Sequence, residues 1–151
     1  MSKALNQMVG FHFMVSFFNL PTNKKLDINF KSVSGLNVTV KNDKIKEGGE
    51  NRFVHTLPSG ISYEPIILKR GVLKPKDSGL TQWCQMAFQE FNFVPLETVD
   101  VIVLDDRHNP ILRWKLSHVI PLKWKISKLN AQKSEILIET LVLKYANFKV
   151  V

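Results

Sequence analysis

Hydrophobic and polar residues alternate with a period of two over several stretches of this chain. In Gly10–Phe18, phenylalanine and valine occupy the odd positions, and His12, Met14 and Ser16 lie between them. This alternation of β-favouring residues predicts a strand. Similar alternation, or apolar residues on both faces, predicts further strands at Leu26–Val33, Leu36–Lys41, Ser62–Val72, Thr98–Leu104, Ile111–Ile126 and Ile136–Tyr145.

The segment Ile111–Ile126 shows the longest alternation. Every even position from 112 to 126 is apolar except His118, whereas the odd positions are largely basic or polar. The pattern continues across Pro121, a residue that is normally confined to edge strands and bulges. We therefore predict a long or bent strand with one apolar face and one basic face, the latter formed by Arg113, Lys115, Lys123 and Lys125, with Lys128 just beyond.

One segment has the periodicity of an amphipathic helix. Six apolar residues recur at the spacing of a single helical stripe, which we expect to pack on the core. They are Leu80, Trp83, Cys84, Ala87, Phe88 and Phe91. Asp77 or Ser78, which follow Pro75, would supply the N-cap of this helix.

About seven strands and one helix predict a mainly β fold, a two-sheet β-sandwich or barrel with the amphipathic helix packed against it. No internal repeat, low-complexity tract or linker divides the chain, so we expect residues 1–151 to form a single domain. The segment Asn42–Gly60 is long, polar and rich in turn residues. It is therefore predicted to be a projecting loop or hairpin.

Composition narrows the class of protein. The chain of 151 residues has one cysteine, Cys84, which excludes an internal disulfide and a cluster of thiolate ligands. No apolar run reaches the roughly 18 residues of a membrane span, so we expect no stable membrane insertion. Met1–Met8 lack the apolar stretch of a signal peptide. These features predict a protein that is made in the cytoplasm.

The formal net charge of +8 is distributed unevenly. Residues 1–76 carry 12 basic and 5 acidic side chains, residues 77–106 carry 6 acidic ones and no basic ones, and residues 107–151 carry 9 basic and 2 acidic ones. The predicted basic face is either a solvated strand face or a surface for nucleic acid, an acidic cargo or the acidic segment of another copy. Trp114 and Trp124 are expected on the opposite face, which disfavours base stacking.

Motifs for catalysis and for cofactor binding are weak. The four histidines lack the spacing that places two metal ligands on one helical face. Asp105, Asp106 and His108 lie in a short turn, where such residues favour local hydrogen bonds. Cys84 falls within the apolar helical stripe, where an inert thiol is expected, and Gly48–Asn51 lacks the spacing of a phosphate-binding loop. We predict no catalytic residues, no metal site, no cofactor and no enzyme activity.

Seven segments together resemble the tube proteins of contractile tails. This family comprises myovirus tail tubes and the inner tubes of extracellular contractile injection systems, and it is related in fold to the type VI secretion tube protein. The segments occur in the family's order and cover nearly the whole chain. They are Phe11–Phe17, Phe30–Leu36, Glu47–Phe53, Leu68–Val72, the helix from Leu80, Asn109–Trp114 and Ile138–Tyr145.

The resemblance implies a two-sheet β-barrel-like domain with a flanking helix, six copies of which join their sheets into a homohexameric ring. Stacked rings would form a hollow tube inside a contractile sheath, in contact with spike and hub proteins of the baseplate. DNA or effector proteins would pass along the lumen, and no catalysis is implied. The protein would be assembled in the cytoplasm and become part of a phage tail or a released extracellular particle.

The resemblance also implies that the contacts between stacked rings are made by Glu47, Gly48, Gly49, Glu50, Asn51, Arg52 and Phe53. Glu50 and Arg52 are candidates for charge-paired hydrogen bonds, and Phe53 either joins these contacts or anchors its own loop. The form of this loop and the strong positive charge resemble the tube initiator on the baseplate hub more than the main tube subunit. The alternative function is that of a monomeric basic β-barrel that binds nucleic acid.

Overall fold

The computed structural model describes residues 12–20, 25–46 and 54–151, so the predicted ring-stacking loop 47–53 lies outside the described residues. The first elements are β1 (Phe13–Phe17), η1 (Lys25–Ile28), β2 (Ser32–Ser34), β3 (Val38–Lys46), β4 (Val54–Tyr63) and β5 (Ile66–Gly71). They are followed by η2 (Pro75–Asp77), α1 (Gly79–Glu90), β6 (Leu96–Leu104), β7 (Pro110–Ile126), β8 (Ile138–Lys144) and β9 (Asn147–Val150).

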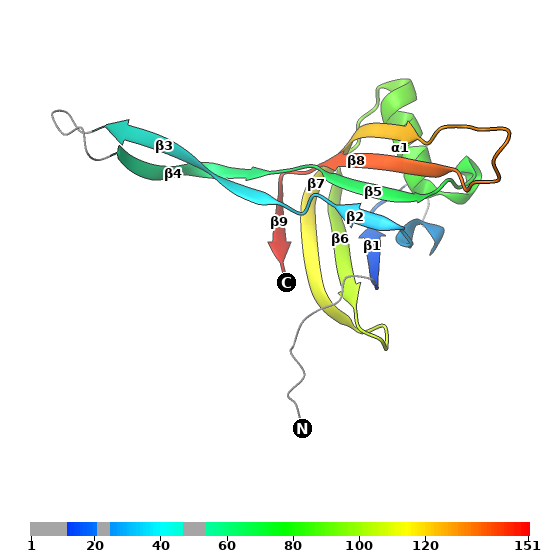
Figure 1. Cartoon of the computed structure of the whole chain (residues 1–151), viewed down its shortest axis with the longest axis horizontal. Helices are drawn as coiled ribbons and strands as arrows, with labels where there is room; N and C mark the ends of the chain where they lie inside the picture. The colour runs from blue at the N-terminus through cyan, green and yellow to red at the C-terminus, as the bar shows by residue number, and fades with distance from the viewer. Residues whose placement is uncertain (1–11, 21–24, 47–53) are drawn as a thin grey trace.

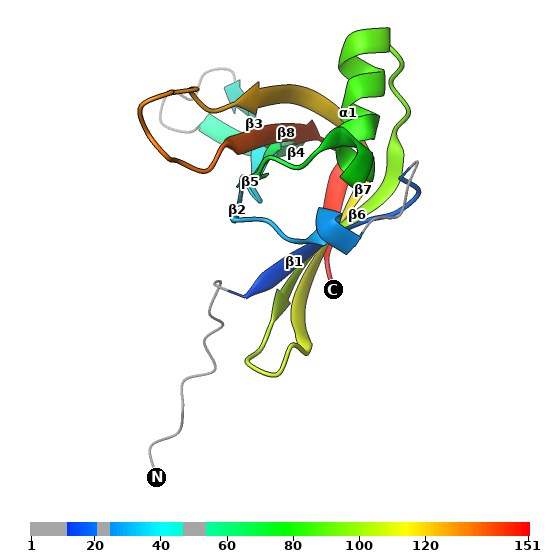
Figure 2. The ribbon, with the colours of Figure 1, turned by 90° about the vertical axis from the view of Figure 1, so that its right-hand side faces the viewer.

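Seven strands form one strongly bent sheet. Its order is β1-β6-β7-β8-β5-β2, with β9 beside β7. The first part of β7 pairs with β6 and β9, and its last part pairs with β8. Because β7 changes direction along its length (Figures 1 and 2), we distinguish a first half-sheet, β1-β6-β7-β9, from a second half-sheet, β7-β8-β5-β2. The prediction of a mainly β fold with two sheets and one helix is confirmed.

Two irregularities explain the bend in β7. His118 has a left-handed backbone with a φ of 55°, and the pairing with β8 shifts between Pro121 and Lys123. Between these points the buried side chains, Val119 and Pro121, occupy odd positions, and the even-numbered Leu122 is 50% exposed. The strand is long and bent, as predicted, but the prediction that its even positions form one apolar face is wrong, because each irregularity reverses the alternation and the two reversals cancel.

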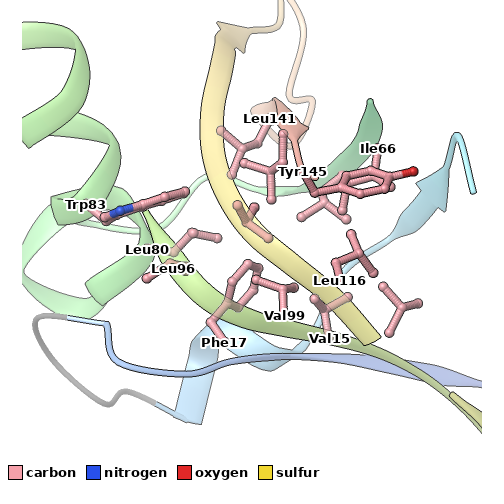
Figure 3. Close-up of a cluster of buried hydrophobic side chains, with 14 of the residues drawn as sticks. Val15, Phe17, Ile66, Leu80, Trp83, Leu96, Val99, Leu116, Leu141 and Tyr145 are labelled. Atoms are coloured by element: carbon pink, nitrogen blue, oxygen red, sulfur yellow. The ribbon is translucent and has the colours of Figure 1, made fainter. Parts of the chain in front are cut away.

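The hydrophobic core lies between the two half-sheets and α1. Its fully buried side chains include Val15, Val99, Leu116, Ile66, Leu68, Leu143, Leu80 and Trp83. Figure 3 shows Leu80 and Trp83 pointing from the helix toward this cluster. The indole N–H of Trp83 donates to the Val94 carbonyl at 2.7 Å, which satisfies its polar edge. The helix thus closes one side of the core.

Side-chain and backbone caps fix both ends of α1. Ser78 Oγ accepts a hydrogen bond from the Thr81 N–H at 3.0 Å, so Ser78, and not Asp77, is the N-cap. Phe91 adopts the left-handed conformation at the C-cap, which ends the helix.

The predicted core stripe of α1 is correct only in its first part. Leu80, Trp83, Cys84 and Ala87 are buried, whereas Phe88 is 40% exposed and Phe91 is 85% exposed. The prediction for these two phenylalanines is wrong because the last turn of the helix extends beyond the sheets that cover its first turns (Figure 2).

Strands β3 and β4 form a two-stranded antiparallel hairpin that projects from the half-sheets (Figure 1). We call this hairpin the arm. It includes most of the predicted strand Leu36–Lys41 and the described part of the predicted loop or hairpin Asn42–Gly60. The arm is longer than predicted because the pairing extends back to Val38 and Tyr63, across a register shift between Lys41 and Asn42.

The predicted strand Leu26–Val33 is largely absent. Its first part belongs to the short 3-10 helix η1, and only Ser32–Ser34 pair as strand β2. The reason is a buried carboxylate: Asp27 is 2% exposed, and its Oδ2 accepts a hydrogen bond from the Leu80 N–H at the start of α1. A continuous strand here would alternate residues between the two faces of the sheet and give Asp27 no such partner.

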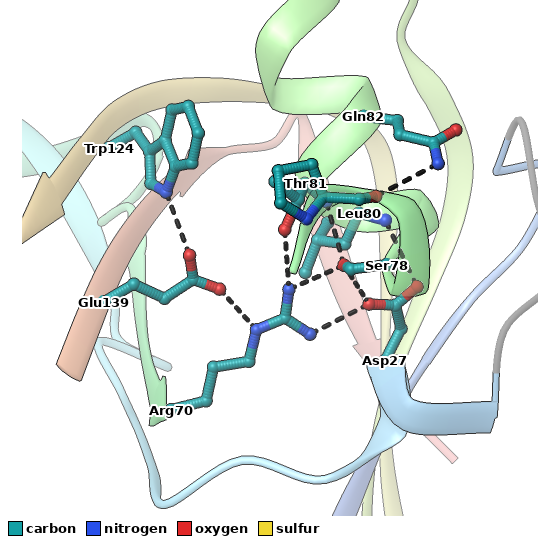
Figure 4. Close-up of polar contacts among 9 residues, drawn as sticks. Asp27, Arg70, Ser78, Leu80, Thr81, Gln82, Trp124 and Glu139 are labelled. Carbon is teal, nitrogen blue, oxygen red and sulfur yellow. Dashed lines mark hydrogen bonds and ion pairs between the residues drawn. The ribbon is translucent and has the colours of Figure 1, made fainter. Parts of the chain in front are cut away.

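Asp27 belongs to a buried charge cluster centred on Arg70 (Figure 4). The Arg70 guanidinium donates to Glu139 through Nε and to Asp27 through Nη1, the latter at 2.8 Å. Its Nη2 donates to Ser78 Oγ at 2.8 Å and to Thr81 Oγ1 at 3.2 Å. One cation therefore joins η1, β5, β8 and the first turn of α1.

The remaining oxygens of the cluster also have partners. Glu139 Oε2 accepts from the Trp124 indole N–H at 3.1 Å, and the Ser78 hydroxyl donates to Asp27. The Arg70 Cζ atom lies 5.3 Å from the centre of the Phe30 ring. Because every charged group of the cluster has a protein partner, the loss of one member would leave the others buried and unpaired.

We expect Arg70→Met to lower the free energy of unfolding by about 3–5 kcal/mol, because two buried carboxylates would lose their counter-ion. Arg70→Lys should also be destabilising, since an ammonium group cannot reproduce the planar fork of donors. Urea denaturation measures both changes. The matched control is Lys69→Met, an exposed neighbour in the same strand, for which we expect a change within about 0.5 kcal/mol. Equal losses for Arg70→Met and Lys69→Met would contradict a structural role of the cluster.

Candidate assembly surfaces

Both edges of the first half-sheet are open in the described part of the chain. Strand β1 pairs there only with β6, and β9 pairs only with β7. The Val151 N–H, just after β9, donates a hydrogen bond to the Arg113 carbonyl of β7. Backbone N–H and C=O groups point to alternate sides along a strand, so those of Phe148 and Val150 point away from β7, toward the open edge. Such an edge is a template for another strand.

A polar row crosses the outer face of this half-sheet. Ser16, Asp100, Lys115 and Lys149 are direct cross-strand neighbours on β1, β6, β7 and β9. Asp100 is only 4% exposed, and its Oδ1 has no hydrogen-bond partner among the described residues. Its Oδ2 lies 3.8 Å from Arg113 Nε. The row thus combines a buried carboxylate with basic groups on an otherwise exposed face.

The structure divides the residues of the predicted basic face between two surfaces. Arg113 and Lys115 lie on the outer face of the first half-sheet, whereas Lys123 and Lys125 lie on that of the second. Trp124 donates a hydrogen bond to Glu139 (Figure 4), and Trp114 packs against the core. Neither indole therefore shares a face with the basic side chains of β7.

Two lysines of the second half-sheet were not among the predicted site residues. Lys69 on β5 and Lys144 on β8 are exposed and lie on the same face as Lys123 and Lys125. The sequence contains a signal for the orientation of Lys69: it follows Leu68, which is buried, so the alternation of the strand turns the Lys69 side chain outward. The pairing of β5, β8 and β7, which the sequence does not reveal, is what brings the four lysines onto one face.

The arm carries an uncovered apolar surface. Val38, Val40 and Ile61 are 50%, 49% and 59% exposed. Val40 and Ile61 are direct cross-strand partners, and Val38 pairs with Tyr63 on the same face. A two-stranded ribbon with one apolar face is marginally stable unless something covers it.

The arm is joined to the body through aromatic contacts. The Tyr63 ring lies 5.9 Å from that of Tyr145 and 5.0 Å from that of Phe148. Tyr145 is 6% exposed, and its hydroxyl has no partner within the described ranges. Burial, with smaller contributions from Tyr63 and Glu64, raises the pKa of Tyr145 to about 12.

A second apolar patch lies at the end of α1. The Phe91 ring contacts that of Phe93 at 5.2 Å, and the Phe88 ring lies 6.4 Å from that of Phe93. All three side chains are exposed by at least 38%. The patch is separate from the arm in sequence.

The described residues offer little for catalysis. They contain no group of three or more histidine, cysteine, aspartate or glutamate side chains that could hold a metal. Desolvation raises the pKa of the Cys84 thiol to about 12, so it is not a thiolate near neutral pH. Asp105 accepts backbone N–H bonds from Arg107 and Asn109, as in an ordinary turn, and these bonds lower its pKa. No helix within 12–20, 25–46 or 54–151 is long and apolar enough to cross a membrane.

Open sheet edges and uncovered apolar surfaces are typical of β-rich structural components that assemble with other chains. Over residues 9–149, the sequence matches the family of the T4-like virus tail tube protein gp19. The chain belongs to this tail tube family, so the resemblance to contractile tail tube proteins is confirmed. The family is structural.

Solved structures contain similar chains. A chain of the anti-feeding prophage baseplate, solved with six-fold symmetry, is 29% identical, with a TM-score of 0.84 over 100% of this chain and 97% of that chain. A chain of the extended PVC sheath-tube complex of an extracellular contractile injection system is 18% identical, with a TM-score of 0.77 over 98% and 93%. A type six secretion system protein is 11% identical, with a TM-score of 0.62 over 93% and 82%. The last two show a shared fold alone. No curated protein matches the sequence.

We expect Tyr145→Phe to leave the free energy of unfolding at neutral pH unchanged or slightly higher, because the hydroxyl removed is buried without a partner. In the folded state the pKa of Tyr145 is about 12, against an ordinary 10.0. The folded protein therefore binds this proton more tightly, and the resulting stability is present below pH 10 and is lost as the pH rises toward 12.

Urea denaturation across this pH range measures the effect. The Cys84 thiol also loses stabilisation at alkaline pH, so the informative quantity is the difference between the wild type and Tyr145→Phe. The wild type should lose more stability than the variant. Parallel curves would contradict the elevated pKa of Tyr145.

Proposed function

We propose that six copies of this chain form a ring of the inner tube of a contractile particle. The observation that carries the proposal is the 29% identity, over the full length of this chain, to a component of a baseplate with six-fold symmetry. The two open edges of the first half-sheet supply a means of closing such a ring. No catalytic step is part of this function.

The directions of the strands suit pairing between copies. Neighbouring strands of the first half-sheet are all antiparallel, so β1 and β9 run in opposite directions. Rotation about a ring axis preserves strand direction, and β1 of one copy would therefore meet β9 of the next in antiparallel orientation. Closure of the six half-sheets would remove every exposed edge from them.

The arm suits contacts beyond its own body. Its uncovered residues Val38, Val40 and Ile61 would be buried against a neighbouring copy, in the same ring or in the next one. The loop 47–53, with Glu50 and Arg52 as candidates for charge-paired hydrogen bonds, would take part in stacking one ring on another. These contacts would also give the two-stranded arm the cover that it lacks in the single chain.

We propose further that this ring is the one that begins the tube at the baseplate. Identity to the baseplate chain is 29%, against 18% to a chain of the sheath-tube complex. In this position the chain would meet spike or hub proteins on one side and the first ordinary tube ring on the other, inside a sheath. DNA or effector proteins would pass through its lumen, and the ring would be assembled in the cytoplasm before the particle is released.

Ring closure through β9 is tested by Val150→Pro. Proline removes the one N–H that Val150 directs toward the open edge, so we expect the chain to fold but to lose most of its rings. Val150→Ala, which keeps the N–H, is the matched control. Light scattering after size-exclusion chromatography and electron micrographs at equal concentration report the hexamer. Rings as abundant in Val150→Pro as in wild type would exclude this join, and a strictly monomeric wild type would overturn the ring itself.

A further inference from the structure

Four lysines share the outer face of the second half-sheet. Lys69, Lys123, Lys125 and Lys144 project from β5, β7 and β8, strands that lie side by side (Figure 1). Leu68, Arg70, Leu143 and Tyr145, which flank Lys69 and Lys144, are buried, and Trp124, between Lys123 and Lys125, packs against the core. We call these four side chains the lysine face.

No carboxylate neutralises this face from within the sheet. The other outward positions on the described strands are neutral: Ser32, Ser34, Ile67, Gly71, Ile120, Ile138, Thr140 and Val142. Thr140 lies directly between Lys69 and Lys125, which places these two lysines about 10 Å apart, and Lys123 is about 7 Å from Lys125 along β7. No two of these lysines are direct cross-strand partners, but four like charges without a counter-charge repel one another, so the arrangement is unfavourable in the isolated chain.

A second copy of this chain offers no matching acidic surface in its described residues. The acidic segment 77–106 does not gather its carboxylates in one place. Glu97 lies near the start of β6, and Asp106 lies in the turn beyond its end. The nine-residue strand β6 therefore holds these two carboxylates far apart. Asp100 is buried in the other half-sheet. Charge complementarity therefore points to a different molecule.

The chemistry of the face favours a protein over a nucleic acid. Trp124 and Tyr145, the aromatic residues nearest to these lysines in sequence, are turned inward, so neither ring is available on this face for base stacking. The Thr140 hydroxyl between Lys69 and Lys125, and the Ser32 and Ser34 hydroxyls on the neighbouring edge strand β2, can donate hydrogen bonds to carboxylates.

We propose that the lysine face docks a protein surface rich in aspartate and glutamate. The inference goes beyond the proposed ring, because the face is separate from the strand edges and from the arm through which copies would meet. Salt should weaken this docking strongly, since exposed charges supply most of the attraction.

The experiment measures binding of fluorescein-labelled polyglutamate to the full chain by fluorescence anisotropy. We expect Lys69→Glu combined with Lys125→Glu to weaken binding by about tenfold or more, because two attractive charges become repulsive. The matched control is Lys76→Glu with Arg107→Glu, two exposed positions away from the face that give the same change in net charge. The control should change affinity by less than about threefold. Equal losses in the two variants would overturn the proposal, because binding would then follow net charge alone.

Two further measurements distinguish the other partners. If labelled oligothymidylate binds more tightly than polyglutamate and depends on the same two lysines, the face is a nucleic-acid surface and the proposal is wrong. If the double variant loses rings that the wild type forms, the face is a contact between copies and the proposal is again wrong. Absence of rings in the wild type would contradict the proposed function only. Circular dichroism verifies folding, and Lys69→Gln with Lys125→Gln replaces the reversal if the variant is unfolded.

Discussion

The bond between Arg70 and its two carboxylates is the constraint on which the rest of the fold depends. Asp27 and Glu139 lie 43 and 69 residues from Arg70 in the sequence, and all three side chains are at least 95% buried. Charges without water tolerate little displacement, because each one needs its partners at bonding distance. The cluster therefore specifies where η1, β5, β8 and the first turn of α1 must meet, which hydrophobic packing alone would leave less determined.

Fixing α1 in this way determines which surfaces remain free. The helix closes one side of the core with Leu80 and Trp83, so each half-sheet needs cover on its inner face only. The outer faces can then carry lysines, and the edge strands β1 and β9 need not be shielded by other elements of the same chain. The position of α1 thus leaves the interior closed and the strand edges open. Both features suit a subunit whose remaining contacts come from other chains.

Periodicity in the sequence was sufficient to predict the fold class and most strands, because burial on one face leaves a period of two. It failed where a side chain serves a distant partner. Asp27 turns its segment into η1 without a local signal, whereas His118, the one even position from 112 to 126 that is not apolar, marks where the alternation in β7 reverses. Arg70 had one: it follows Ile66 and Leu68 at alternate, buried positions of β5, and a charged residue there requires a buried counter-ion. Which residues supply the counter-ion depends on how the strands pair, and the sequence does not reveal this pairing. The same holds for the approach of Lys69 to Lys125 on one face.

The buried groups also change the meaning of the net charge. Arg70, Asp27 and Glu139 together carry −1, and buried Asp100 carries another −1, so a chain of formal charge +8 carries +10 on its remaining residues. The interior thus holds a surplus of acidic groups and leaves the basic ones outside. Among the described residues Asp100 compensates Arg113, but the four lysines of the lysine face have no carboxylate beside them in the sheet, so much of the excess positive charge on the outer faces has no counter-charge. Its favourable partners must be anions supplied by solvent or by another molecule, and this makes assembly at these faces sensitive to salt.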